Sequence, residues 1–341
     1  MKQRIITGVI LILLAFFWIY TPSCESLLSK VGLVTHLSLI PFFFFIIGLC
    51  VILSVSTYEF LQFILPKKIE YDENNQLTKA SRLRSLFRVF VIEVVGLFIF
   101  LYFICFNGFG FAYEIATEWA RPQNLFTNLH GHDIYKYILC LSVVLWLVNA
   151  VLVMTYPKSK VIVSNMFFKL FSFFIIFASF ALSALVLRFS GYKTDPYMGS
   201  NIILSVMILV WCADSGAYFV GRAIGKHKMS PNVSPNKTIE GLLGGVVCSL
   251  IAFVILEKLN MFGTEGYSSN LYALTFAAVC TVIISVFGDL MESVFKREAG
   301  IKDSGVIFPG HGGMLDRLDS VYAAFPMFIM SYALFELVVG K

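Results

Sequence analysis

Nine apolar runs dominate this sequence, and each is about long enough to cross a lipid bilayer as a helix. A hydrocarbon core of about 30 Å needs roughly 20 helical residues. The runs lie near residues 5-21, 38-64, 86-106, 136-156, 167-188, 198-220, 239-256, 270-288 and 319-340. We therefore predict an all-α fold, a polytopic membrane protein with about nine transmembrane helices.

The composition excludes several other classes of protein. Hydrophobic residues make up 58% of the chain and charged residues 14%, against about 25% charged residues in a soluble domain. This balance rules out a soluble enzyme with a single anchor. The seven cysteines form no CxxC pair, so they indicate neither a zinc site nor a disulfide framework. A net charge of +5, without a basic run interleaved with aromatics, indicates no nucleic-acid partner.

The basic residues predict the orientation of the spans. The first run follows Lys2 and Arg4 and no A-x-A cleavage site follows it, so we expect an uncleaved anchor with a cytoplasmic N-terminus. With that orientation, most Lys and Arg residues fall on the cytoplasmic side, as the positive-inside rule requires. The polar motifs of the second half then also face the cytoplasm.

The chain divides by character into two regions. Residues 1-190 are predicted to form an N-terminal transmembrane scaffold, because their polar residues fall mostly in loops. Glu93 is an exception inside a span, where we expect a basic partner rather than catalysis. In residues 191-341 polar residues enter the apolar runs, which predicts a catalytic transmembrane region with cytoplasmic loops.

The segment 293-319 concentrates bases, acids and glycines beside two apolar runs. Charge next to a bilayer is costly unless it is paired, wetted or bound to an ion, so this segment is a candidate functional site. If the helix continues past residue 288, four polar side chains share one face, namely Asp289, Glu292, Ser293 and Lys296. Such a face suits a divalent cation and a phosphate, or equally an internally paired helix end.

Two further motifs precede this segment. Asp214 interrupts an apolar run, and the basic loop that follows it from Gly221 suits either a phosphate site or ordinary topology. Thr238 is a predicted helix N-cap, and with Lys237 it favours an anion-binding helix start, although a simple capped helix explains it equally well.

The last motif joins the final two spans. The run 310-313 carries three glycines around His311 and permits close backbone approach to a ligand. We expect His311 to contact phosphate or transfer a proton, the alternative being a turn residue. Asp316 and Asp319 follow one helical turn apart.

Together these residues resemble the signature of the bacterial phosphatidate cytidylyltransferases, also called CDP-diacylglycerol synthases. The matching elements are Lys296-Arg297, Lys302-Asp303, His311-Gly312-Gly313 and Asp316-Arg317-Leu318-Asp319. The runs 214-218 and 234-241 are similar to further family motifs, except that Asn236 stands where relatives often carry a lysine. The resemblance is strong from about residue 200 to 320.

This resemblance implies that phosphatidate and CTP give CDP-diacylglycerol and pyrophosphate, with Mg²⁺ held by Asp289 and Asp316 and in some relatives K⁺ as well. The implied catalytic residues are Asp289, Asp316, Lys296, Arg297, Lys302, Asp303 and His311. The implied substrate-binding residues are Asp214, Arg222, Ser234, Lys237, Thr238, Glu240, Ser293, Arg317 and Asp319. The family also implies a homodimer in the bacterial inner (cytoplasmic) membrane, with its active site facing the cytoplasm.

Two other functions fit parts of the pattern. A CTP-dependent kinase of a polyprenol or phytol type would transfer the γ-phosphate to an alcohol, but it should lack the full signature from Lys302 to Gly313. An ion-coupled transporter would bind cations at Asp214 and Asp289, but that class predicts inverted repeats and the sequence shows none.

Overall fold

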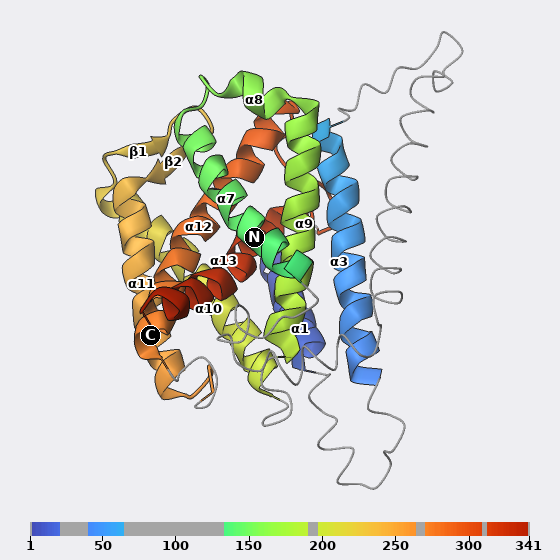
Figure 1. Ribbon diagram of the computed structural model, residues 1–341. Helices are drawn as coiled ribbons and strands as arrows, with labels where there is room; N and C mark the ends of the chain where they lie inside the picture. Colours follow the sequence, from blue (N-terminus) through green and yellow to red (C-terminus); the bar gives the residue numbers. More distant parts are fainter. Residues whose placement is uncertain are drawn as a thin grey trace, which may run out of the picture.

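Long helices packed side by side make up most of the described structure (Figure 1). The computed structural model describes residues 2–20, 40–64, 133–189, 197–263, 270–308 and 312–339. The helices are α1 (Lys2–Tyr20), α3 (Ile40–Ile64), α7 (Asp133–Met154), α8 (Lys160–Ser164), α9 (Met166–Phe189), α10 (Met198–Ile224), α11 (Ile239–Lys258), α12 (Leu271–Glu298) and α13 (Leu315–Val339). Two short strands, β1 (Lys228–Ser230) and β2 (Ser234–Thr238), connect α10 to α11.

The predicted all-α, multi-pass membrane architecture is confirmed. In the described ranges six helices, α3 and α9 to α13, are long and apolar enough to cross a membrane. Two shorter apolar helices, Ile6–Tyr20 and Leu139–Met154, coincide with two more expected spans. The expected span 86-106, with Glu93, lies outside the described residues.

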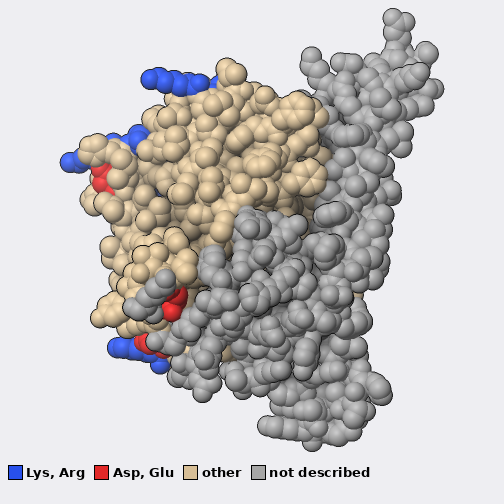
Figure 2. Space-filling model, in the orientation of Figure 1, with Lys and Arg blue, Asp and Glu red and all other residues tan. Residues whose placement is uncertain are grey.

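The surface agrees with a position in lipid. In Figure 2, the charged side chains of the described residues gather toward the two ends of the visible face, and the described residues between them form a broad uncharged band. Along α11, exposed apolar side chains recur at helical spacing, at Leu243, Val247, Ile251 and Val254. Such a row is suited to acyl chains, which solvate apolar side chains as well as a protein core does.

Glycines bring neighbouring helices into close contact. A Cβ added at Gly216 of α10 would lie 2.6 Å from the Cβ of Cys248 in α11. A Cβ added at Gly288 of α12 would lie 2.7 Å from the backbone oxygen of Asp319 in α13. Small residues therefore allow these helix pairs, which carry the charged motifs, to approach backbone to backbone.

The structure adds detail that the apolar runs did not predict. The segment Ser234–Thr238 forms an antiparallel strand, with Ser230 opposite Ser234 and Lys228 opposite Thr238. In addition, α12 continues to Glu298 and α13 already begins at Leu315. A hydropathy window ends where polar residues begin, but a helix continues wherever those polar side chains find partners.

Candidate functional site

A polar cavity of about 370 Å³ lies between α10, α12 and α13. Its walls include five carboxylates, from Asp214, Asp289, Asp303, Asp316 and Asp319. Lys296 and Arg317 are the basic residues among its described lining, and Trp211 contributes an aromatic wall one turn from Asp214. The structure thus brings together seven of the residues predicted from the sequence, from three separate motifs.

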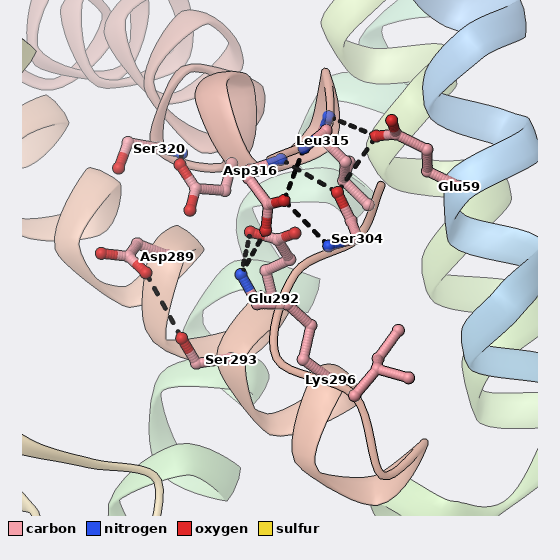
Figure 3. Close-up of polar contacts among 12 residues, drawn as sticks. Glu59, Asp289, Glu292, Ser293, Lys296, Ser304, Leu315, Asp316 and Ser320 are labelled. Atoms are coloured by element: carbon pink, nitrogen blue, oxygen red, sulfur yellow. Dashed lines mark hydrogen bonds and ion pairs between the residues drawn. The ribbon is translucent and has the colours of Figure 1, made fainter. Parts of the chain in front are cut away.

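The polar face of α12 exists as predicted (Figure 3). The Ser293 hydroxyl donates to the Asp289 carboxylate over 3.4 Å, and Lys296 forms an ion pair with Glu292 at 3.1 Å. Lys296 and Glu292 are both buried. The face is therefore partly an internally paired helix end, and it also lines the cavity.

Asp316 is held in place by several donors. Lys296 donates to its Oδ1 over 2.7 Å, and the backbone N–H groups of Ser304 and Gly313 each donate to its Oδ2 over 2.8 Å. Its side chain is 5% exposed. A carboxylate with this many charge-assisted hydrogen bonds has one orientation.

Asp289 has a different basic partner. Lys237 of β2 forms an ion pair with Asp289 Oδ2 at 2.6 Å and lies 3.4 Å from the backbone oxygen of Val286. The prediction that Thr238 caps α11 is confirmed, since its Oγ1 accepts from Gly241 N over 3.1 Å. Lys237 points to α12, so the hairpin and the α12 face form one site.

Asp319 lies beside the same carboxylates. Its side chain interacts with the carboxyl groups of Asp289 and Glu292. Its Oδ1 also accepts from the Ser320 N–H over 2.7 Å. Acids from α12 and α13 therefore meet in one group, where their mutual repulsion favours a bound cation.

Several predicted residues lie outside the described cavity lining. Glu240 closes the loop before β1, because it accepts from the N–H groups of Lys226 and His227 and contacts His227 Nδ1 at 2.5 Å. Arg222 donates to the hydroxyl of Tyr218. Their substrate contacts stay a prediction, as do those of a further set: Ser234, Thr238, Arg297 and Lys302.

The turn before α13 is built on glycines. Gly312 has φ +86°, a backbone conformation that favours glycine, and Gly312 pairs with Phe308 in an isolated bridge. His311 lies outside the described residues, so its predicted role stays a prediction. The backbone around Gly313 approaches carboxylates of the protein itself, at Asp316 and Glu59.

Two contributors were missed in the sequence, Glu59 and Ser304. Glu59 of α3 accepts hydrogen bonds from Ser304 Oγ, Met314 N and Leu315 N. It is the one charged residue in the sequence of α3, and an isolated acid in a span is itself a signal of function. Ser304 carried no such signal, because serine is common in loops.

The donor set fits a divalent cation that is completed by other ligands. In the described part of the chain, no three His, Cys, Asp or Glu side chains converge as a self-sufficient metal site. The cavity nevertheless has five carboxylates against two basic groups in its lining. Carboxylate oxygens are preferred by Mg²⁺, which usually retains water and binds substrate phosphates as well.

Known proteins resemble this chain along most of its length. The model of the cytidylyltransferase family matches residues 2–335. A phosphatidate cytidylyltransferase of Haemophilus influenzae is 35% identical over 97% of this chain and 98% of its own length. One from Staphylococcus haemolyticus is 33% identical over 69% of this chain and 94% of its own. One from Pseudomonas aeruginosa is 43% identical over 56% of this chain and 67% of its own.

Proposed function

Because this chain belongs to the cytidylyltransferase family, we propose that it transfers CMP from CTP to phosphatidate. The products are CDP-diacylglycerol and pyrophosphate. The observation that carries the proposal is the polar cavity between apolar helices, where aspartates and basic groups from three motifs meet. Such a place serves a reaction between a water-soluble nucleotide and a lipid headgroup.

The reaction needs charge neutralisation more than covalent help from the protein. A phosphate oxygen of phosphatidate attacks the α-phosphorus of CTP, and the bond between the α-phosphorus and the bridging oxygen to the β-phosphate breaks. Pyrophosphate leaves with that bond's electron pair. Since two anions must approach and a third departs, positioning and fixed positive charge supply most of the rate enhancement.

We assign Asp289 and Asp316 to a Mg²⁺ site that substrate phosphates complete. When bound, the ion neutralises phosphate charge and orients the reacting groups. Asp319, Asp214 and Asp303 line the same cavity and support this cation electrostatically. A monovalent cation such as K⁺ is a further candidate occupant of this acidic group.

Lys237 and Lys296 have two parts in this proposal. In the structure each holds one of the two aspartates in a fixed orientation. Each ammonium group also has one donor left for a phosphate, because a lysine carries three and two of them are used, by Lys237 on Asp289 and Val286 and by Lys296 on Asp316 and Glu292. Arg297, Lys302 and Arg317, all exposed, are assigned to the phosphates that arrive from the water side, where a guanidinium binds two oxygens at once.

The predicted orientation completes the proposal. We place the protein in the bacterial inner membrane, with the β1–β2 hairpin and the cavity mouth facing the cytoplasm, where CTP is found. Basic residues concentrate on the hairpin and its flanks, at Arg222, Lys226, Lys228 and Lys237. A homodimer is the expected assembly.

The decisive experiment separates transfer of the α- and γ-phosphates. Purified protein is incubated with Mg²⁺, CTP labelled at either position, and phosphatidate or a polyprenol. Label entering phosphatidate-derived lipid from the α position supports the proposed activity. Label entering a lipid alcohol from the γ position indicates a CTP-dependent kinase, and label entering no lipid, with cation flux into vesicles, indicates a transporter.

A further inference from the structure

A carboxylate from the first half of the chain lies at the start of α13. Glu59 belongs to α3, yet its side chain reaches the turn that precedes α13 (Figure 3). The residue is 1% exposed. A buried acid in an apolar span is costly to keep, so the contacts that hold it there matter for its role.

Among the described residues, the donors to Glu59 come from the turn that follows α12 and from the start of α13. The N–H of Met314 donates to Oε1 over 3.0 Å, while the N–H of Leu315 and the Ser304 hydroxyl donate to Oε2 over 2.7 Å and 3.1 Å. The two N–H groups lie at the N-terminus of α13, where backbone donors lack helical partners and negative charge is favoured. Glu59 therefore caps α13 from another helix: its carboxylate accepts the N–H groups that the side chain of a local N-cap residue normally accepts.

The turn is shaped to admit this carboxylate. A Cβ at Gly305 or at Gly313 would collide with the Glu59 carboxylate oxygens. A Cβ at Gly313 would also collide with Ser304 Oγ. Gly305 and Gly313, both in the segment 293-319, therefore leave the space that the Glu59 carboxylate occupies.

Ser304 links Glu59 to Asp316. A hydroxyl has one hydrogen to donate, and Ser304 donates it to Glu59, so its lone pairs accept the N–H of Asp316 at 3.3 Å. The Ser304 backbone N–H meanwhile donates to the Asp316 carboxylate. The chain of contacts runs from α3 through the turn to the aspartate assigned to the cation.

Aromatic packing between α3 and α12 fixes the position of Glu59 along α3 relative to α12. The ring of Phe60, its neighbour in α3, lies 5.4 Å from that of Phe295, and the ring of Phe63 lies 6.2 Å from it. Phe295 directly precedes Lys296, the partner of Asp316. Contacts with α3 therefore reach both partners of the Lys296–Asp316 ion pair: Glu59 acts through Ser304 on Asp316, and Phe60 packs against the residue before Lys296.

We propose that Glu59 is a positioning residue for the transfer reaction, acting through Ser304 and the start of α13 on Asp316. This inference rests on the proposed function, and it gives one helix of the predicted scaffold a specific part in catalysis. Removal of the carboxylate leaves the turn with unmatched donors, and Asp316 then samples several orientations. Misplacement of a reacting group by about 1 Å can cost about 100-fold in rate.

Glu59→Gln is the sharpest single test. It keeps the shape of the side chain but offers one acceptor oxygen to three donors. Its NH₂ group, itself a donor, then faces a backbone N–H or the Ser304 hydroxyl. We expect kcat to fall by roughly 10- to 100-fold, as for other residues that orient a metal ligand, with KM for phosphatidate unchanged. Glu59→Asp keeps the charge and should recover part of kcat.

Ser304→Ala tests the connection from Glu59 through Ser304 to Asp316 without altering α3. It should lower kcat in the same range, and the double variant Glu59→Gln/Ser304→Ala should be little slower than the worse single variant, since both act on one unit. Thr57→Val is the matched control, because Thr57 is buried on the same helix and its hydroxyl has no hydrogen-bond partner among the described residues. It should leave kcat unchanged.

Each outcome decides a separate point. A folded Glu59→Gln protein with wild-type kcat overturns the inference, as does a kcat loss that merely follows the folded fraction measured by thermal melting. If Glu59→Gln does not fold, Ser304→Ala decides, and wild-type kcat there overturns it equally. Failure of the wild-type protein to place α-label in lipid would instead refute the proposed function.

Discussion

Lys237 and Asp289, 52 residues apart in the sequence, form an ion pair of 2.6 Å between β2 and α12. The two side chains are 25% and 31% exposed, so the pair lies at the edge of the cavity rather than in the core. A pair in this position is accessible to a phosphate group. We therefore expect it to combine orientation of the aspartate with binding of a substrate phosphate.

Replacing Lys237 should affect turnover more than stability. We expect Lys237→Met to lower kcat/KM for CTP by about 100-fold or more, the usual loss when one fixed positive donor is removed from a charged transition state. The measurement is α-label transfer at saturating phosphatidate. Lys228→Met, at an exposed position on β1, is the matched control and should stay near wild type. Equal losses in both variants would show that only general surface charge matters.

Asp289 and Asp316 should behave as one catalytic unit. Both side chains line the same cavity, although they belong to different helices. Asp289→Asn or Asp316→Asn should each lower turnover by orders of magnitude, and the double variant should be little worse than either single one. The measurement is steady-state turnover across a Mg²⁺ titration.

Folding must be controlled in these variants. Each should match the wild-type protein in detergent-solubilised yield and in thermal melting before its rate is compared. Well-folded single variants with near-normal, chelator-sensitive activity would remove both residues from the metal site.

Much of this site could be predicted, because local rules govern it. The α12 face follows from helical periodicity, and the cap at Thr238 follows from residue type and position. The apolar runs likewise predicted the described membrane helices. In each case the information lies within a few residues of sequence.

The missed features depend on contacts between distant segments. Glu59 and Leu315 are 256 positions apart, and nothing near either residue encodes their hydrogen bond. The strand at Ser234–Thr238 forms because β1 lies beside it, although its sequence contains a proline and an asparagine. The sequence also did not predict which group Lys237 contacts. A bound anion at the start of α11 and the Asp289 carboxylate are chemically equivalent partners for a lysine, and only the fold brings Asp289 within reach.

Packing between α10 and α11 should be sensitive to added volume. At Gly216 a side chain would meet Cys248 and the backbone oxygen of Gly244, at 2.6 Å and 2.8 Å from its Cβ. Gly216→Val should therefore cost about 1–3 kcal/mol, the usual penalty for overpacking, and lower the melting temperature in detergent. Val247→Ala, on the exposed side of α11, serves as control. An unchanged melting temperature for Gly216→Val would mean that the two helices can separate freely.

Reporter fusions should fall on opposite sides of the membrane. A reporter fused after residue 230 should read cytoplasmic, because the basic residues of the hairpin stay inside. Three membrane-crossing helices, α11, α12 and α13, follow that point. An odd number of crossings puts a reporter fused after Lys341 in the periplasm. Two reporters on the same side would refute the predicted topology.

The lipid tails of the acceptor should be necessary for efficient turnover. The cavity opens among helices whose outer surfaces are apolar, so acyl chains that stay in the bilayer hold the phosphate near the basic groups. Glycerol 3-phosphate has the same phosphate monoester but loses this anchoring, which normally contributes to transition-state binding. We expect it to be a very poor acceptor in an α-label assay, while a short-chain phosphatidate in mixed micelles retains substantial activity. Comparable kcat/KM for glycerol 3-phosphate and phosphatidate would show that the acceptor is recognised by its headgroup alone and would contradict a site built for a membrane-embedded lipid.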